Sequence, residues 1–351
     1  MRRYVISVFE GDFRVAQRHE SILQILLKSK KITPRSNIIC SIRKNIRRWG
    51  ELTGDCMKYL PSTFKNNIVD NYGEKGREWL ERLGDRVQNL SAKWNLTNFE
   101  TFPNLTFNYV VSALSGEVPV VLKVGIEHDL LRREAAVMTF FKNHGAVDLI
   151  DSCDGALLLK RCSPGYSLMD FFPYDEKKSV EIATNVIKNL RLASKEQKDF
   201  SDFVSLNAIL KDLDHPSNIA KEYLDKAKNF AEHLLETSYE KVAMHGDLHH
   251  DNIIYDQTEN CWKVIDPFGV VGDSTYEFAS FMINPIDKIW KRADAISLVE
   301  ERARTFSQIA NVDPQRLKQW AFVKAVLCLI WTAKTENQDR FELVKLFDKI
   351  I

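Results

Sequence analysis

The stretch from Val242 to Pro267 constrains this chain more than any other part of it. Its sequence is VAMHGDLHHDNIIYDQTENCWKVIDP. It places Asp247 after a His-Gly pair, Asn252 five residues later, and Asp266 at the end of an apolar run. Transfer of a phosphoryl group to a hydroxyl needs a carboxylate that orients the hydroxyl and accepts its proton, and oxygen ligands for Mg²⁺. We therefore predict Asp247 as the catalytic base and Asn252 and Asp266 as the metal ligands.

The residues between the asparagine and the second aspartate predict a β-hairpin. Residues 252–255 and 261–265 are strand-like, and the turn-rich sequence DQTEN lies between them. A hairpin returns Asp266 to the neighbourhood of Asn252, so that one ion can contact both. Mg²⁺ takes few protein ligands and leaves its other positions to water and phosphate oxygens. One amide and one carboxylate are therefore enough.

The pattern H-G-D-L-H-x-x-N followed by I-D-P resembles the aminoglycoside-phosphotransferase-like kinases. The continuation through residues 269–273 and 276–281 is similar to the streptomycin 6-kinase and hydroxyurea phosphotransferase branch. The resemblance implies an α+β, bilobal, protein-kinase-like fold with a small β-rich N-lobe and a larger, mainly helical C-lobe. It also implies ATP and Mg²⁺ as cofactors, and a place for His245 in the catalytic loop. Nothing comparable covers the first fifty or so residues.

A lysine and a glutamate upstream predict the nucleotide-binding part of the site. Lys123 lies in the second strand of a predicted hairpin formed by residues 105–114 and 118–124. Glu134 falls on the apolar stripe of the helix that follows. An unpaired buried charge is costly, so we predict that the two side chains pair and that Lys123 is held toward the α- and β-phosphates. The alternative is a surface lysine and a surface glutamate at unrelated positions.

Two further features concern the nucleotide. Residues 148–160 predict two short strands around Asp154-Gly155, and residues 156–162 resemble the strand and hinge where adenine hydrogen-bonds to backbone. On this basis Lys160 and Cys162 are predicted cofactor-binding residues. There is no G-x-G-x-x-G sequence, which argues against a protein kinase and leaves Phe107 and Asn108 as candidates for the phosphate loop.

The domain organisation follows from length and charge. A chain of 351 residues with 44% hydrophobic residues is expected to form two lobes. We predict a basic extension at 1–56, a helical lead-in plus nucleotide-binding N-lobe at 57–162, and a C-lobe at 163–351. The extension holds 12 Lys or Arg against 5 Asp or Glu, which is compatible with a tail that contacts nucleic acid or lipid. The preferred interpretation is that Met57 is the true start.

Composition also bears on partners and location. A net charge of +1 gives no argument for nucleic-acid or membrane binding. Six scattered cysteines without a C-x-x-C pair indicate reduced thiols in a cytoplasmic setting. The longest apolar stretch, residues 321–333, is interrupted by Lys324 and is too short to span a bilayer. The expected partner is a small hydroxylated molecule, while the oligomeric state has no sequence signal.

The acceptor is the most open part of the prediction. Streptomycin carries guanidinium groups, and carboxylates near the catalytic segment could bind them; these are Asp247, Asp251, Asp273 and Glu277. The leading hypothesis is a kinase for a hydroxyl of an aminoglycoside such as streptomycin. The alternatives are a kinase for another small hydroxylated metabolite or hydroxyurea, and a nucleotide-binding module without turnover. A zinc site at His245 and His249 is disfavoured, because Gly246 and the loop context do not provide the helix of an H-E-x-x-H site.

Overall fold

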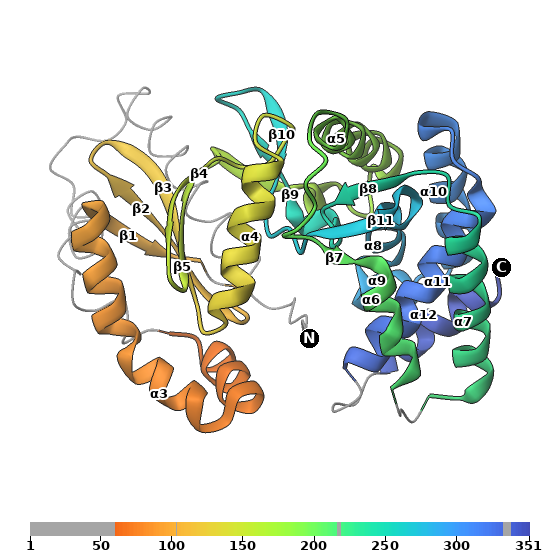
Figure 1. The fold of residues 1–351 in the computed structure, drawn as a ribbon, viewed down its shortest axis with the longest axis horizontal. Helices are drawn as coiled ribbons and strands as arrows, with labels where there is room; N and C mark the ends of the chain where they lie inside the picture. Colours follow the sequence, from red (N-terminus) through yellow and green to blue (C-terminus); the bar gives the residue numbers. More distant parts are fainter. Residues whose placement is uncertain (1–59, 103, 216–218, 333–337) are drawn as a thin grey trace, which may run out of the picture. The chain divides into compact units, whose positions relative to one another are not determined.

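The computed structural model describes residues 60–102, 104–215, 219–332 and 338–351. The chain divides into two compact units between Ile126 and Glu127. The predicted basic extension, residues 1–56, lies outside the described residues. The predicted lobe boundary between residues 162 and 163 stays a prediction. Both units contain helices and strands, as an α+β protein does (Figure 1).

A long broken helix opens the described part of the first unit. Helix α3 (Ser62–Trp94) leaves helical geometry at Gly73, where φ is 58° and ψ is −128°. This break divides the predicted helical lead-in into two helices. The rings of Phe64 and Trp79, one on each side of the break, pack edge to face with centroids 6.3 Å apart, and Trp94 is buried. These tryptophans are therefore packing residues.

Three antiparallel strands complete the first unit: β1 (Leu96–Thr101), β2 (Asn108–Ser115) and β3 (Val118–Gly125). The β2–β3 hairpin was predicted, and it turns at Gly116 with a φ of 61°. Strand β1 was not predicted. Its sequence, LTNFET, is half polar, and the strand exists because it pairs with the free edge of β2 across an irregularity between Thr97 and Glu100.

The second unit begins with a helix and a hairpin. These are α4 (His128–Phe140), β4 (Leu149–Cys153) and β5 (Ala156–Lys160). The antiparallel strands β4 and β5 turn at residues 154–155, as predicted, and Gly155 supplies the positive φ of 70°. Helix α4 packs against this hairpin.

Helices make up most of the second unit. They are α5 (Glu176–Glu196), α6 (Leu206–Leu210), α7 (Lys221–Glu236), α8 (Ala279–Ile283), α9 (Ile286–Ile289), α10 (Ala295–Ala310), α11 (Pro314–Trp331) and α12 (Gln338–Asp348), with 3₁₀ turns η2 (Leu168–Phe171), η3 (Lys211–Asp214), η4 (His250–Asn252) and η5 (Ser274–Phe278). Helix α11 packs against α7, α8, α10 and α12 (Figure 1). Every residue from Trp320 to Leu327 is buried. A helix that is surrounded by other helices buries all its faces, as this segment does. Among the described residues, no helix is long and apolar enough to cross a membrane.

Two small three-stranded sheets frame the motif-bearing segment. Their strands run in the orders β10-β9-β6 and β7-β11-β8. The strands are β6 (Pro164–Ser167), β7 (Val204–Ser205), β8 (Lys241–Met244), β9 (Ile253–Asp256), β10 (Cys261–Val264) and β11 (Val270–Asp273). The predicted hairpin is β9–β10, with Asp256 opposite Cys261 and Ile253 opposite Val264. Residues 245–252 connect β8 of one sheet to β9 of the other, and we call them the catalytic loop.

Candidate active site

His245 is fixed inside the catalytic loop. Its side chain is fully buried, and its Nε2 lies 2.8 Å from the carbonyl oxygen of Ile265. A carbonyl only accepts, so Nε2 carries the proton. Nδ1 then accepts a 3.3 Å hydrogen bond from the backbone N–H of Asp247. Both ring nitrogens are hydrogen-bonded to the backbone, so His245 stabilises the loop conformation and neither nitrogen is available to bind zinc.

Gly246 has no room for a side chain. Its φ is 80°, and a Cβ built on it would lie 2.4 Å from Cγ2 of Val270 on β11. Its backbone N–H donates to Oε1 of Glu277 at 3.2 Å, and its carbonyl accepts from Nζ of Lys324 at 3.1 Å. A side chain here would require both the strained backbone and the displacement of a core valine.

Asp247 and Asn252 are joined across the loop. The Asn252 Nδ2 donates to the backbone carbonyl of Asp247 at 2.9 Å, and the Asn252 N–H donates to the His249 carbonyl at 3.0 Å. Asn252 is buried, whereas the Asp247 side chain is 24% exposed. The backbone of Asp247 is thus held from both sides while its carboxylate retains access to solvent.

Backbone hydrogen bonds connect the segment carrying Asp266 to the same loop. The N–H of Ile265 donates to the Asn252 carbonyl at 3.1 Å. The N–H groups of Phe268 and Gly269 both donate to the His245 carbonyl at 2.9 Å. Asp266 itself has a φ of 58°, a left-handed conformation that side-chain-bearing residues adopt rarely and that is frequent at functional sites. The hairpin therefore returns this aspartate to the loop, as the sequence predicted.

His249 is a loop residue that the sequence did not single out for this role. Its Nδ1 accepts from the N–H of Asp251 at 3.3 Å, so its proton lies on Nε2, which is 3.8 Å from Oδ2 of Asp247. The side chain is 5% exposed. It thus presents an N–H toward the predicted base.

A buried arginine supports the far end of the loop. Arg302 of α10 binds both carboxylate oxygens of Glu176 at 2.7 and 3.0 Å, and it donates to the carbonyls of Phe281, Met282 and Asn284 at 2.6–3.3 Å. The ring of His250 stacks on that of Phe281 with centroids 3.9 Å apart. Burial, with the charge of Arg302 beside it, lowers the pKa of His250 well below its ordinary value, so its ring is neutral.

Two of the four carboxylates expected to bind a cationic acceptor are committed to the scaffold. Asp273 forms an ion pair with Arg316 and accepts from the N–H of Thr275 at 2.8 Å. Glu277 is buried and accepts hydrogen bonds from the loop backbone. Burial raises its pKa to about 7, although these hydrogen bonds lower the pKa. Asp247 and Asp251 remain as acidic groups with exposed surface.

The predicted nucleotide-binding residues occupy both units. Lys123 of β3 is 2% exposed within the first unit, and Glu134 of α4 is 7% exposed within the second. Their burial agrees with the sequence argument, and their pairing stays a prediction. Lys160, at the end of β5, lies 2.5 Å from Glu259 in the β9–β10 turn. Cys162 is buried, and burial raises the pKa of its thiol to about 12. The role of both residues in adenine binding stays a prediction.

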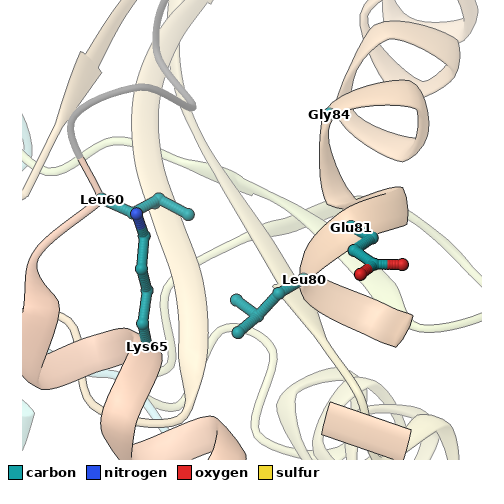
Figure 2. Close-up of a pocket in the computed structure, with 5 residues that line it drawn as sticks. All are labelled: Leu60, Lys65, Leu80, Glu81 and Gly84. Carbon is teal, nitrogen blue, oxygen red and sulfur yellow. The ribbon is translucent and has the colours of Figure 1, made fainter. Parts of the chain in front are cut away.

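A hollow of about 300 Å³ in the first unit is separate from these residues. Figure 2 shows its lining, which consists of Leu60, Lys65, Leu80, Glu81 and Gly84. All but the first belong to α3. None of them is a predicted site residue.

Comparison with known proteins identifies the family. Residues 103–336, more than half of the chain, match the family described as "Aminoglycoside/hydroxyurea antibiotic resistance kinase". The chain belongs to this family. It is an ATP-dependent phosphotransferase whose acceptor is an alcohol group, and the resemblance read from the catalytic segment is confirmed.

Two curated relatives are similar to this chain over most of their length. One is a streptomycin 3''-kinase of Klebsiella pneumoniae, 26% identical over 246 residues, which cover 68% of this chain and 89% of the relative. The other is a streptomycin 6-kinase of Streptomyces glaucescens, 20% identical over 281 residues, which cover 78% and 90%. The two names specify different hydroxyl positions on one drug.

Solved structures show the fold of this chain. One is the aminoglycoside phosphotransferase APH(4)-Ia in a ternary complex with ADP and hygromycin B, with a TM-score of 0.55, 15% identity, and coverage of 75% of this chain and 96% of that one. Another is the choline kinase LicA from Streptococcus pneumoniae, with a TM-score of 0.58, 12% identity, and coverage of 76% and 98%. The α+β, bilobal, protein-kinase-like fold with a β-rich N-lobe and a mainly helical C-lobe is thus confirmed.

Proposed function

We propose that this kinase transfers the γ-phosphoryl group of ATP to a hydroxyl of an aminoglycoside such as streptomycin, with Asp247 as the base. One observation carries the proposal. The catalytic loop and the segment of Asp266 form one hydrogen-bonded unit, in which Asn252 contacts the backbone of both. A fixed arrangement of this kind supplies the positioning that phosphoryl transfer requires.

The role of Asp247 follows from its surroundings. Its backbone donates to His245 and accepts from Asn252, so the main chain on which the carboxylate stands is fixed. The exposed part of the side chain can accept a hydrogen bond from an acceptor hydroxyl, orient it, and take its proton as the new bond to phosphorus forms. General-base groups of this kind contribute about 10²- to 10⁴-fold to the rate.

Asn252 and Asp266 fit Mg²⁺ as oxygen donors. The Asn252 side chain uses its Nδ2 as a donor to the Asp247 carbonyl, which leaves Oδ1 as its ligand atom. Carboxylate and amide oxygens are the ligands this hard cation takes. When bound, Mg²⁺ would neutralise charge on the phosphate oxygens of ATP.

The nucleotide would be bound by groups already buried in their own units. We assign Lys123 to the α- and β-phosphates, with Glu134 as its partner, because each is buried and a buried charge requires a partner. The hinge around Lys160 and Cys162 would bind adenine through its backbone. The ion pair between Lys160 and Glu259 then serves to hold the hinge against the β9–β10 turn.

The acceptor assignment rests on the family and on two relatives that are named as streptomycin kinases. Because those relatives are named for different hydroxyls, the proposal concerns the drug and leaves the position to experiment. Asp251, beside the base, is the acidic side chain left to meet a guanidinium group, since Asp273 and Glu277 are engaged within the scaffold.

The test is mass spectrometry of streptomycin incubated with the full-length protein, ATP and Mg²⁺, with Asp247→Asn as the matched control. We expect a mass gain of one phosphoryl group, lost with the variant, and fragmentation will identify the hydroxyl. Absence of product despite ATP binding would refute streptomycin and favour another small hydroxylated metabolite or hydroxyurea. Absence of both product and ATP binding would favour a module without turnover, and undiminished turnover by Asp247→Asn would remove Asp247 as the base.

A further inference from the structure

Lys324 is an unusual residue for its position. It lies in the middle of α11, where every neighbour from Trp320 to Leu327 is buried, and it is itself 6% exposed. Burial favours the neutral amine, yet the neighbouring Tyr276 and Asp247 side chains outweigh this effect and raise the pKa of Lys324. An ammonium ion inside a helical core therefore persists and must be bound by something specific.

The partner of this ammonium is the catalytic loop. Nζ of Lys324 donates to the carbonyl oxygen of Gly246 at 3.1 Å, and it lies over the ring of Tyr276 at 5.2 Å and that of Trp331 at 5.4 Å. The face of an aromatic ring attracts a cation at such distances. The hydrogen bond connects residue 324 to residue 246, the residue directly before the proposed base.

The N–H of the same residue, Gly246, is also bound by a side chain. The N–H of Gly246 donates to Oε1 of Glu277, which follows Tyr276 in η5. A cation thus binds the carbonyl of Gly246 and a carboxyl group binds its N–H. Because Gly246 has a left-handed conformation, its backbone has no ladder or helix to fix it. The two side chains therefore provide the hydrogen-bond partners that a helix or strand would otherwise give to the N–H and the carbonyl of Gly246.

We propose that Lys324 is a positioning residue of the phosphoryl-transfer reaction, which fixes the Gly246 carbonyl and thereby the backbone from which Asp247 projects. The inference rests on the proposed function of Asp247. It predicts a defect in the chemical step and not in substrate binding, since Lys324 is buried and donates its hydrogen bond to the backbone of the loop. Neither the motif nor the spacing of the loop residues indicates this role.

The test compares Lys324→Met with Lys318→Met. Both residues lie on α11 and both form buried or half-buried polar contacts, but Lys318 binds Glu300 and the Ile350 carbonyl. Steady-state kinetics is measured with ATP and streptomycin for the parent and both variants. We expect Lys324→Met to lower kcat by about 10- to 100-fold, the range seen when groups that orient reacting or ligating residues are removed, with KM values within about threefold of the parent. Lys318→Met should match the parent, and Lys324→Arg, which restores a charged donor, should recover part of kcat.

Hydrogen–deuterium exchange supplies a readout that does not depend on turnover. Peptides covering residues 244–252 should exchange faster in Lys324→Met than in the parent and in Lys318→Met, at temperatures where all three are folded. Parental kcat and parental exchange in Lys324→Met would overturn the inference, as would equal losses in Lys318→Met. If the parent forms no phosphorylated product while the exchange difference is present, the proposed function fails and the positioning contact stands.

Discussion

Gly246→Ala tests whether the loop conformation depends on the absence of a side chain. A Cβ at this position would lie 2.4 Å from Cγ2 of Val270 and would have to adopt a φ of 80°. The left-handed conformation costs a residue with a side chain about 1–2 kcal/mol, and overpacking a core costs about 1–3 kcal/mol. We therefore expect the free energy of unfolding, measured in urea by tryptophan fluorescence, to fall by about 2–5 kcal/mol.

Two further variants separate the contributions to this loss. Gly116→Ala has a similar positive φ, 61°, but nothing lies within 4 Å of the added Cβ, so it measures the backbone cost alone. Val270→Ala in the Gly246→Ala background removes the 2.4 Å contact with Cγ2 and leaves the Cβ at 3.2 Å, and the double-mutant cycle should give a favourable coupling of about 1–3 kcal/mol. The reasoning is refuted if Gly246→Ala destabilises no more than Gly116→Ala, or if the cycle shows no coupling.

Two other variants test the charges of the site. Burial raises the folded-state pKa of Glu277 from its ordinary 4.5 to about 7. The folded protein therefore binds this proton more tightly than the unfolded chain does. As the pH rises between these two values, the free energy of unfolding should fall by up to about 3 kcal/mol. Glu277→Gln should abolish that slope in urea unfolding from pH 5 to 8; an unchanged slope would assign it elsewhere. Asp266→Asn introduces a residue that also tolerates a left-handed φ but lacks the carboxylate. Calorimetry should therefore show weaker binding of Mg²⁺-ATP by the variant than by the parent. Equal affinity would remove Asp266 from the metal site.

Local sequence patterns predicted the parts of the site that are close together in the chain. The β9–β10 hairpin follows from two strand-like runs around a turn-rich sequence, and it is what returns Asp266 to Asn252. The turns at Gly116 and Gly155 are also local, because a glycine between strand-forming residues supplies the positive φ. The burial of Lys123 and Glu134 could be predicted because each interrupts an apolar pattern.

The parts that could not be predicted depend on contacts between distant residues. Strand β1 is specified by the edge of β2 and not by its own half-polar sequence. Asp273 looked available for a cationic acceptor, but Arg316, 43 residues later, neutralises it. Lys324 was visible only as an interruption of an apolar stretch, and its partner 78 residues earlier in the chain is a backbone carbonyl, which no side-chain pattern reveals.

The buried charges around the loop have a common physical reason. Removing paired charges from a core often leaves stability unchanged or improved, so stability alone does not explain Glu277 and Lys324. What they bind is the backbone of a segment that leaves one sheet at β8 and enters another at β9, where its N–H and carbonyl groups have no ladder partners. Buried backbone groups must still be paired. A loop that exposes a base while its own main chain is buried therefore needs polar side chains of the surrounding helices as hydrogen-bond partners. For this reason the buried ionisable side chains of Glu277 and Lys324 lie next to Gly246, the residue before Asp247.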